Sequence, residues 1–332
     1  MILRCRVEVK VALHDNDLTG YPNLALMKLA AHHRAASDTV EWFNSLLGGY
    51  DLVYSSRVFT WSSRDPYLPA AAVCGGTGHD LGGTLPEAVE HACPDYSLYG
   101  CKASYGFLTR GCVRTCEWCF VPRKEGKIRA HADIDEFVRH PDVVLMDNNV
   151  LAHPHGLDQI DKMARLGLRV DFNQGLDARL IDDAAARRLG RLKWIRHIRL
   201  ACDSSEQIAA VRQAVELLRW HNVNPAQIFC YVLVRDVDDA LERVRFLKGM
   251  YVVPFAQPYR APDGAEPTGQ QKAFARWCNH RAIYKTCTWD DYRRKADFRD
   301  DPGGRLKARS SPSHRLLNAG VESGTKQRNR LD

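Results

Sequence analysis

Long apolar segments are absent from this 332-residue sequence. No window reaches the roughly 18 consecutive apolar residues that a membrane-spanning helix needs. The first ten residues, MILRCRVEVK, also lack the apolar core of a secretory signal peptide. We therefore expect a cytoplasmic protein without membrane contact. The 45% hydrophobic and 26% charged content is sufficient for one large core or two smaller ones.

Closely spaced cysteines are few, although the chain has 11 cysteines in total. The cytosol keeps thiols reduced, so metal or cluster ligation is a better explanation for them than a disulfide framework. Only Cys112, Cys116 and Cys119 lie close together. The other eight are scattered and are typical of small buried side chains: Cys5, Cys74, Cys93, Cys101, Cys202, Cys230, Cys278 and Cys287.

The net charge of +7 is concentrated at one end of the chain. Residues 293–332 contain 11 Lys or Arg and 5 acidic residues, which amounts to +6 of the total. The DDPGG and SSPS segments, together with few large apolar residues, predict a largely disordered tail. Two interpretations stay open for it: a solubilising extension, or a contact with RNA or another acidic partner.

The first hundred residues alternate short apolar runs with amphipathic stretches. Residues 9–13, 40–43 and 51–60 are candidate strands, and residues 20–23 precede a candidate helix. This pattern predicts a small Rossmann-like α/β domain. The glycine-rich segment at residues 75–83 lacks the G-x-G-x-x-G spacing after a strand, which favours a surface loop or a lid over a phosphate-binding loop.

From Tyr105 onward, strands and amphipathic helices alternate. The candidate strands are residues 104–108, 143–146, 170–173, 198–201, 228–234 and 252–256, and the candidate helices are residues 134–139, 157–166, 184–189, 205–219 and 237–248. Such alternation indicates parallel strands joined by crossover connections. We expect an α/β protein with a partial (β/α)6 TIM-type barrel, whose functional residues lie at the carboxyl ends of the strands.

The domain boundaries follow from these patterns. We expect four segments, in chain order the Rossmann-like domain, the partial barrel, a C-terminal helical segment and the basic tail: residues 1–100, 101–265, 266–292 and 293–332.

The three close-set cysteines directly follow the first candidate barrel strand. Their spacing is C-x3-C-x2-C, and three thiolates on one short loop can each bind one iron of a 4Fe-4S cube, which leaves the fourth iron without a protein ligand. A zinc site would need a fourth Cys or His, and structural zinc ligands usually come as separated pairs. The loop is polar and glycine-containing, which disfavours buried structural thiols. A 4Fe-4S cluster is the preferred interpretation.

At this motif the chain resembles the radical S-adenosylmethionine (SAM) superfamily, which has an aromatic residue just before the third cysteine; Trp118 stands there. The resemblance implies that Cys112, Cys116 and Cys119 are the catalytic cluster ligands and that the open iron chelates SAM. One electron would then cleave SAM to methionine and a 5′-deoxyadenosyl radical, which abstracts hydrogen from a substrate. An electron donor such as flavodoxin or ferredoxin is implied as a partner.

The resemblance also implies where SAM is bound. Asp147, Asn148 and Asn149 follow the second strand, where the superfamily carries a glycine-rich, acid-ending segment that binds the SAM amino group. This sequence departs from the Gly-Gly-Glu form of that segment. Even so, Asp147 can accept a hydrogen bond from an ammonium group, and the asparagines can donate or accept.

Polar residues at later strand ends complete the expected site. Asp177 is a candidate helix cap, whereas Asn173, Gln174 and Arg179 have no capping role, and we expect them to face SAM or substrate. Gln257 follows the sixth strand, where the superfamily contacts adenine. Cys278 and Cys287 are too few for a second cluster, so we expect buried thiols there.

The order of the two domains resembles cobalamin-dependent radical SAM enzymes and, more loosely, methylthiotransferases. Cobalamin domains generally show Asp-x-His-x-x-Gly, whereas Asp17 occupies the histidine position here. Methylthiotransferases have three further cluster cysteines in this domain, and the cysteines here are irregularly placed. The first hypothesis is therefore a radical SAM enzyme of unidentified substrate. The alternatives are a cobalamin-dependent radical SAM methyltransferase and a non-catalytic, zinc-stabilised module that binds RNA or protein.

Overall fold

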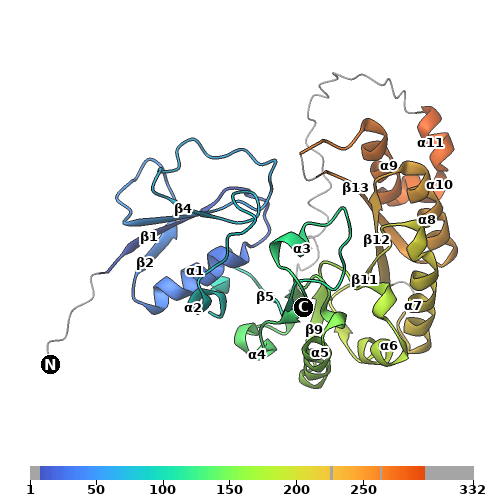
Figure 1. The fold of residues 1–332 in the computed structure, drawn as a ribbon, viewed down its shortest axis with the longest axis horizontal. Coiled ribbons are helices and arrows are strands. Elements are labelled where there is room, and N and C mark those ends of the chain that lie inside the picture. The colour runs from blue at the N-terminus through green and yellow to red at the C-terminus, as the bar shows by residue number, and fades with distance from the viewer. Residues whose placement is uncertain (1–7, 225–226, 262–263, 296–332) are drawn as a thin grey trace, which may run out of the picture.

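The computed structural model describes residues 8–224, 227–261 and 264–295. The fold is α/β, as predicted, and its main sheets consist of parallel strands connected by helices and loops (Figure 1). None of the helices in these ranges is both long and apolar enough to cross a membrane. Cys5 and residues 296–332, which form most of the predicted basic tail, lie outside the described residues.

The N-terminal unit is built on a four-stranded parallel sheet. Its strands occur in the order β2 (Thr39–Trp42), β1 (Lys10–Asp15), β3 (Leu52–Ser56) and β4 (Val73–Gly75). Helix α1 (Leu24–Ala35) connects β1 to β2 and starts where the sequence predicts, because Asn23 Oδ1 accepts a hydrogen bond from the Leu26 amide at 3.3 Å. Val11, Leu13 and Leu26 form the centre of its apolar core.

Strand β3 is shorter than predicted. The sequence favours a strand over residues 51–60, but β3 ends at Ser56. Beyond β3, the backbone of Arg57 forms two hydrogen bonds with the glycine-rich loop. The Arg57 amide donates to Gly75 O, and the Gly78 amide donates to Arg57 O at 2.8 Å. A Cβ on Gly78 would lie 2.6 Å from Phe59 O, so the glycines permit close backbone packing.

The second half of the described chain contains two parallel sheets. The first has the order β10 (Lys193–Trp194), β9 (Arg169–Phe172), β8 (Asp142–Leu145) and β5 (Ser104–Gly106). The second has the order β11 (Ile198–Ala201), β12 (Ile228–Val234) and β13 (Val253–Pro258). An isolated parallel bridge between Leu176 and Leu200 connects them. Strands therefore occur at all six predicted positions.

The helices agree with the prediction where the amphipathic pattern is long. They are α5 (Pro154–Leu166), α6 (Asp183–Gly190), α7 (Ile208–Trp220) and α8 (Val237–Gly249), and α8 packs on β12 and β13 (Figure 1). The helix expected at residues 134–139 is shorter. Helix α4 (Ile134–Phe137) begins with a capping box of Asp133 and Glu136, and Val138 is already extended.

One large apolar core extends through the two C-terminal sheets. It also includes buried Phe274 and Trp277 of α9 (Gly269–Asn279) and buried Trp289 of α11 (Trp289–Lys295), and partly buried Ile283 and Tyr284 of α10 (Arg281–Thr286) pack against it. A smaller cluster that includes Met27 and Tyr96, with Met146 packed against it, lies between this core and the N-terminal one. Helices are present over most of residues 266–292, as predicted, and α11 continues to Lys295.

Candidate functional site

The cysteine loop is enclosed by a short hairpin that the sequence did not predict. Strand β6 (Thr109–Arg110) leads into the loop, and the chain returns through α3 (Val121–Lys124) to β7 (Arg129–Ala130), which pairs with β6 in antiparallel fashion. Glu125 closes the base of the loop. Its carboxylate accepts from the Gly111 amide at 2.9 Å and from Arg110 Nη1 at 3.1 Å.

The three thiols are half-buried on this loop. Cys112 Sγ accepts hydrogen bonds from the Arg114 amide at 3.3 Å and from Asn149 Nδ2 at 3.5 Å. Burial raises the pKa of Cys116 and Cys119, and the Arg179 guanidinium opposes this effect at Cys116. Two donors thus reach Cys112 Sγ and a cation lies near Cys116, but burial still favours the neutral thiol at Cys116 and Cys119.

The donor chemistry and the arrangement of the donors lead to different conclusions about a metal. Three thiols on one loop are the ligand type that iron-sulfur clusters use. However, in the part of the chain that the structure describes, no group of three or more Cys, His, Asp or Glu side chains has the arrangement of a metal site. The residues fit a cluster by chemistry and sequence position, and ligation would require the loop to bring its three sulfur atoms together.

Asp147 has a structural role in the described state. Its carboxylate is buried and accepts from the Leu108 amide at 3.1 Å, and from the amide and hydroxyl of Thr109 at 2.6 and 2.7 Å. It thus connects the end of β8 to the strand that enters the cysteine loop. Burial raises the pKa of Asp147 to about 6. These contacts leave Asp147 poorly placed for the predicted bond to the SAM amino group.

Asn148 and Asn149 connect the end of β8 with the cysteine loop. Asn148 Nδ2 donates to Glu125 Oε2 at 2.9 Å, at the base of the loop. Asn149 is buried, and its Nδ2 atom lies between Cys112 Sγ and Asp177 Oδ2. Its Oδ1 atom is buried and has no hydrogen-bond partner among the described residues. This buried acceptor is a candidate contact for a ligand.

Asp177 forms ion pairs with two arginines, Arg114 of the cysteine loop and Arg179 of the segment after β9. It caps the short helix η3 (Ala178–Leu180), as predicted, because Oδ1 accepts from the Arg179 amide. The same carboxylate forms ion pairs with Arg114 Nε at 2.9 Å and Arg179 Nε at 2.7 Å. Arg179 was expected to be available for SAM or substrate. Instead, the structure pairs it with Asp177, next to the cysteine loop.

The remaining predicted residues do not join this network. Asn173, Gln174 and Gln257 are exposed at the ends of β9 and β13. The backbone oxygen of Asn173 accepts a hydrogen bond from the Tyr231 hydroxyl at 3.1 Å. No hydrogen bond or ion pair between these side chains and the cysteine loop occurs in the described residues, so their predicted role in SAM binding stays a prediction.

Sequence reasoning missed the contact that Trp118 makes. The Arg235 guanidinium lies over the Trp118 ring, 4.7 Å from its centroid, and 6.0 Å from the centroid of Tyr259. Arg235 directly follows β12, so one further strand end contacts the cysteine loop, and Tyr259, directly after β13, contacts Arg235. An arginine directly after a buried strand was the available signal, but its partner is more than 100 residues away.

Cys278 and Cys287 are outside this region. Cys278 is buried in α9, which confirms the prediction of a structural thiol there, and burial raises its pKa to about 12. Cys287 is half-buried, and its backbone oxygen accepts a hydrogen bond from Trp277 Nε1 at 2.9 Å.

Residues after β8, β9 and β12 thus contact the cysteine loop, which itself follows β5 and β6, and Tyr259 after β13 contacts Arg235. In parallel α/β folds, the carboxyl ends of the strands are where ligands and catalytic groups gather. The chain matches no known protein-family model, and no curated protein shows significant similarity to it.

Proposed function

We propose that the chain is a radical SAM enzyme in which Cys112, Cys116 and Cys119 hold a 4Fe-4S cluster. The observation that carries this proposal is the C-x3-C-x2-C spacing on a loop that contacts the carboxyl ends of several parallel strands. We further propose that β5, β8, β9, β11, β12 and β13 form a partial barrel around that loop, with the bridge from Leu176 to Leu200 as its join.

When bound, the cluster would supply the single electron for reductive cleavage of SAM, received from a donor such as flavodoxin or ferredoxin. The residues of the chain have binding and orienting roles in this proposal. The Arg114 amide donates to Cys112 Sγ, and the Arg179 guanidinium lies near Cys116, so both can offset thiolate charge. Asn149 Oδ1, a buried acceptor, is a better candidate for the SAM amino group than Asp147, whose oxygens already accept from the chain.

The decisive experiment is anaerobic reconstitution of the full-length chain with iron and sulfide, followed by dithionite and SAM. We expect a brown protein with about four irons per chain that releases 5′-deoxyadenosine. Cys116→Ala should lose both the cluster and SAM cleavage. Cys74→Ala removes an exposed thiol outside the loop and serves as the matched control, which should retain both.

Two outcomes would overturn this proposal. Retained SAM cleavage in Cys116→Ala would contradict the ligand assignment. A colourless protein with one zinc and no iron would instead support the zinc-stabilised binding module. Cobalamin binding by the anaerobically purified protein would support the cobalamin-dependent methyltransferase. The sequence argues against this alternative, because Asp17 stands where the cobalamin motif has histidine.

A further inference from the structure

A second candidate site lies in the N-terminal unit, away from the cysteine loop. It is an open cavity of about 630 Å³ at the carboxyl ends of β1 and β2. The strand order β2-β1-β3-β4 reverses direction between β1 and β3, and ligands of open parallel sheets bind at such a reversal, outside the carboxyl ends of the strands. Asp15 at the end of β1 and Asp65 in the loop after β3 both line the cavity. Both the volume and the position are therefore those of a small-molecule site.

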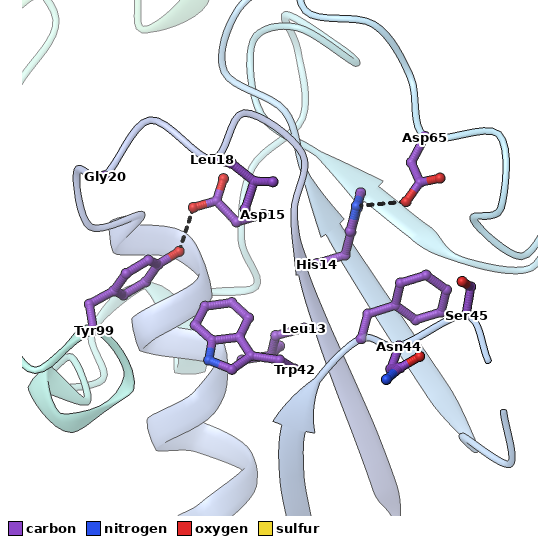
Figure 2. A pocket seen from close by; sticks show the side chains of 11 residues that line it. Leu13, His14, Asp15, Leu18, Gly20, Trp42, Asn44, Ser45, Asp65 and Tyr99 are labelled. Atoms are coloured by element: carbon purple, nitrogen blue, oxygen red, sulfur yellow. Dashed lines mark hydrogen bonds and ion pairs between the residues drawn. The ribbon is translucent and has the colours of Figure 1, made fainter. Parts of the chain in front are cut away.

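Aromatic rings form part of the wall of this cavity. Trp42 and Tyr99 meet edge to face with centroids 5.2 Å apart, and His14 and Phe43 do so at 5.6 Å. Figure 2 shows Trp42 and Tyr99 grouped on one side of the pocket, with His14 and its partner Asp65 on the other. Trp42 is 42% exposed although it is large and apolar, and an edge-to-face pair leaves a ring face available for stacking.

Two of the polar side chains that line the cavity are carboxylates, Asp15 and Asp65; the others are His14, Asn44, Ser45 and Tyr99. Asp65 Oδ2 lies 3.3 Å from His14 Nε2, and Asp15 Oδ2 accepts from the Tyr99 hydroxyl at 2.7 Å. No Lys or Arg is among the described residues that line the cavity. A phosphate or carboxylate ligand would meet two carboxylates and no Lys or Arg among these lining residues, whereas a neutral ring with N–H groups would find acceptors.

We propose that this cavity binds a purine base of the guanine type, whose adjacent N–H groups donate to the Asp65 carboxylate while its ring stacks on Trp42 or Tyr99. The base can belong to a free nucleoside or to a single-stranded RNA. The proposal is independent of the radical SAM function, because none of the cavity residues belongs to the cysteine loop.

The loop after β3 connects this cavity with the second half of the chain. Asp65 lines the cavity, and four residues earlier Trp61 lies under the Arg260 guanidinium, 4.5 Å from its ring centroid. Asn16 fixes the same loop, since its side chain donates to Ser63 O at 2.8 Å and accepts from the Asp65 amide at 3.2 Å. A base bound at Asp65 would therefore contact a loop that also touches the end of β13.

The test is calorimetric titration of the full-length chain, without cluster or reductant, with guanosine as the probe. We expect saturable one-to-one binding that Trp42→Ala and Asp65→Asn each weaken at least tenfold. Trp220→Ala removes another highly exposed tryptophan, on α7, and should leave the affinity unchanged. Trp42→Phe keeps a ring and should retain most of the binding, provided that circular dichroism shows each variant to be folded.

Competition distinguishes the two sources of the base. A guanine-containing single-stranded RNA that displaces guanosine with higher affinity would assign the site to a strand, and an RNA that does not compete would assign it to a free nucleoside. Absence of guanosine binding, or binding that survives both Trp42→Ala and Asp65→Asn, would overturn the proposal. The titration measures only the heat of guanosine binding to protein without cluster or reductant. A negative result would therefore overturn the base-binding proposal without affecting the radical SAM proposal.

Discussion

Glu90 Oε1 lies 3.1 Å from Arg110 Nη2 and so joins the N-terminal unit to the strand that enters the cysteine loop. The same carboxylate oxygen lies 3.4 Å from Lys28 Nζ of α1 and 3.2 Å from His131 Nε2, just after β7. Burial by itself would raise the pKa of Glu90, but the His131 hydrogen bond and the charges of Lys28 and Arg110 outweigh it and lower the pKa to about 2. Burial also lowers the pKa of Lys28, so the cost of burying its ammonium group offsets part of the stabilisation that the ionised Glu90 carboxylate receives.

The first prediction concerns Glu90→Gln. Because the folded-state pKa of Glu90 lies below its ordinary value, its contribution to stability is present above about pH 4.5 and is lost as the pH falls toward 2. We expect Glu90→Gln to lower the free energy of unfolding by about 2 kcal/mol at pH 7 and to reduce the loss of stability between pH 5 and pH 3. Urea unfolding across this pH range measures both effects.

Glu87→Gln is the matched control for this prediction, because Glu87 is exposed on the same short helix, α2 (Glu87–Glu90). It should change the stability by less than about 0.5 kcal/mol. Equal effects of the two substitutions would show that the contacts of Glu90 with Lys28, Arg110 and His131 contribute nothing specific.

The second prediction concerns Arg199→Gln. Arg199 of β11 pairs with both oxygens of Asp171 in β9, at 2.7 and 2.6 Å, and with the Tyr231 hydroxyl of β12 at 2.8 Å. It thus supports the join between the two C-terminal sheets. Its loss leaves a buried carboxylate without its cation, and we expect the free energy of unfolding to fall by about 3 kcal/mol. Arg196→Gln, at an exposed position, should have almost no effect, and comparable losses would contradict this role.

The sequence was sufficient to predict the six longer parallel strands of the second half of the chain, but not the short strands β4 and β10. Residues 198–201 and 228–234 are short apolar runs between amphipathic helices, and the structure has strands with those bounds. Buried parallel strands need apolar side chains on both faces, so their pattern is local and readable. The helix after Asn23 was equally predictable, because a helix cap is a local signal.

Contacts across long sequence separations were not predictable. Arg199 lies inside β11 and pairs with Asp171 of β9, 28 residues earlier, and neither its residue type nor its spacing indicates this partner. The resemblance to the radical SAM superfamily predicts a SAM contact for Asp147, whereas its hydrogen bonds from the Leu108 and Thr109 amides are visible only in the fold. The partner of a polar side chain depends on tertiary packing, which residue type and spacing do not encode.

The third prediction concerns the order of the cysteine loop. Trp118→Ala removes the contact with Arg235, which is worth about 1 kcal/mol. We expect Cys116 and Cys119 in the metal-free protein to react about fivefold faster with iodoacetamide, as followed by peptide mass spectrometry. Trp118→Phe should restore part of the protection. Trp220→Ala should not alter these rates, and an unchanged rate in Trp118→Ala would exclude an ordering role for the ring.

The last prediction concerns the glycine that precedes the first cysteine. Gly111 has φ = +82°, and a Cβ there would lie 2.3 Å from Lys127 O, so Gly111→Ala must push the two sides of the loop base apart. Gly126 is the control, because it has φ = +73° but open space around its Cα; Gly126→Ala therefore carries only the backbone strain of about 1 kcal/mol. We expect Gly111→Ala to lose a further 2 kcal/mol or so of stability and most of its iron after reconstitution, while Gly126→Ala retains iron. Equal stability and equal iron content in the two variants would show that the close approach of Gly111 to Lys127 is not needed to shape the loop.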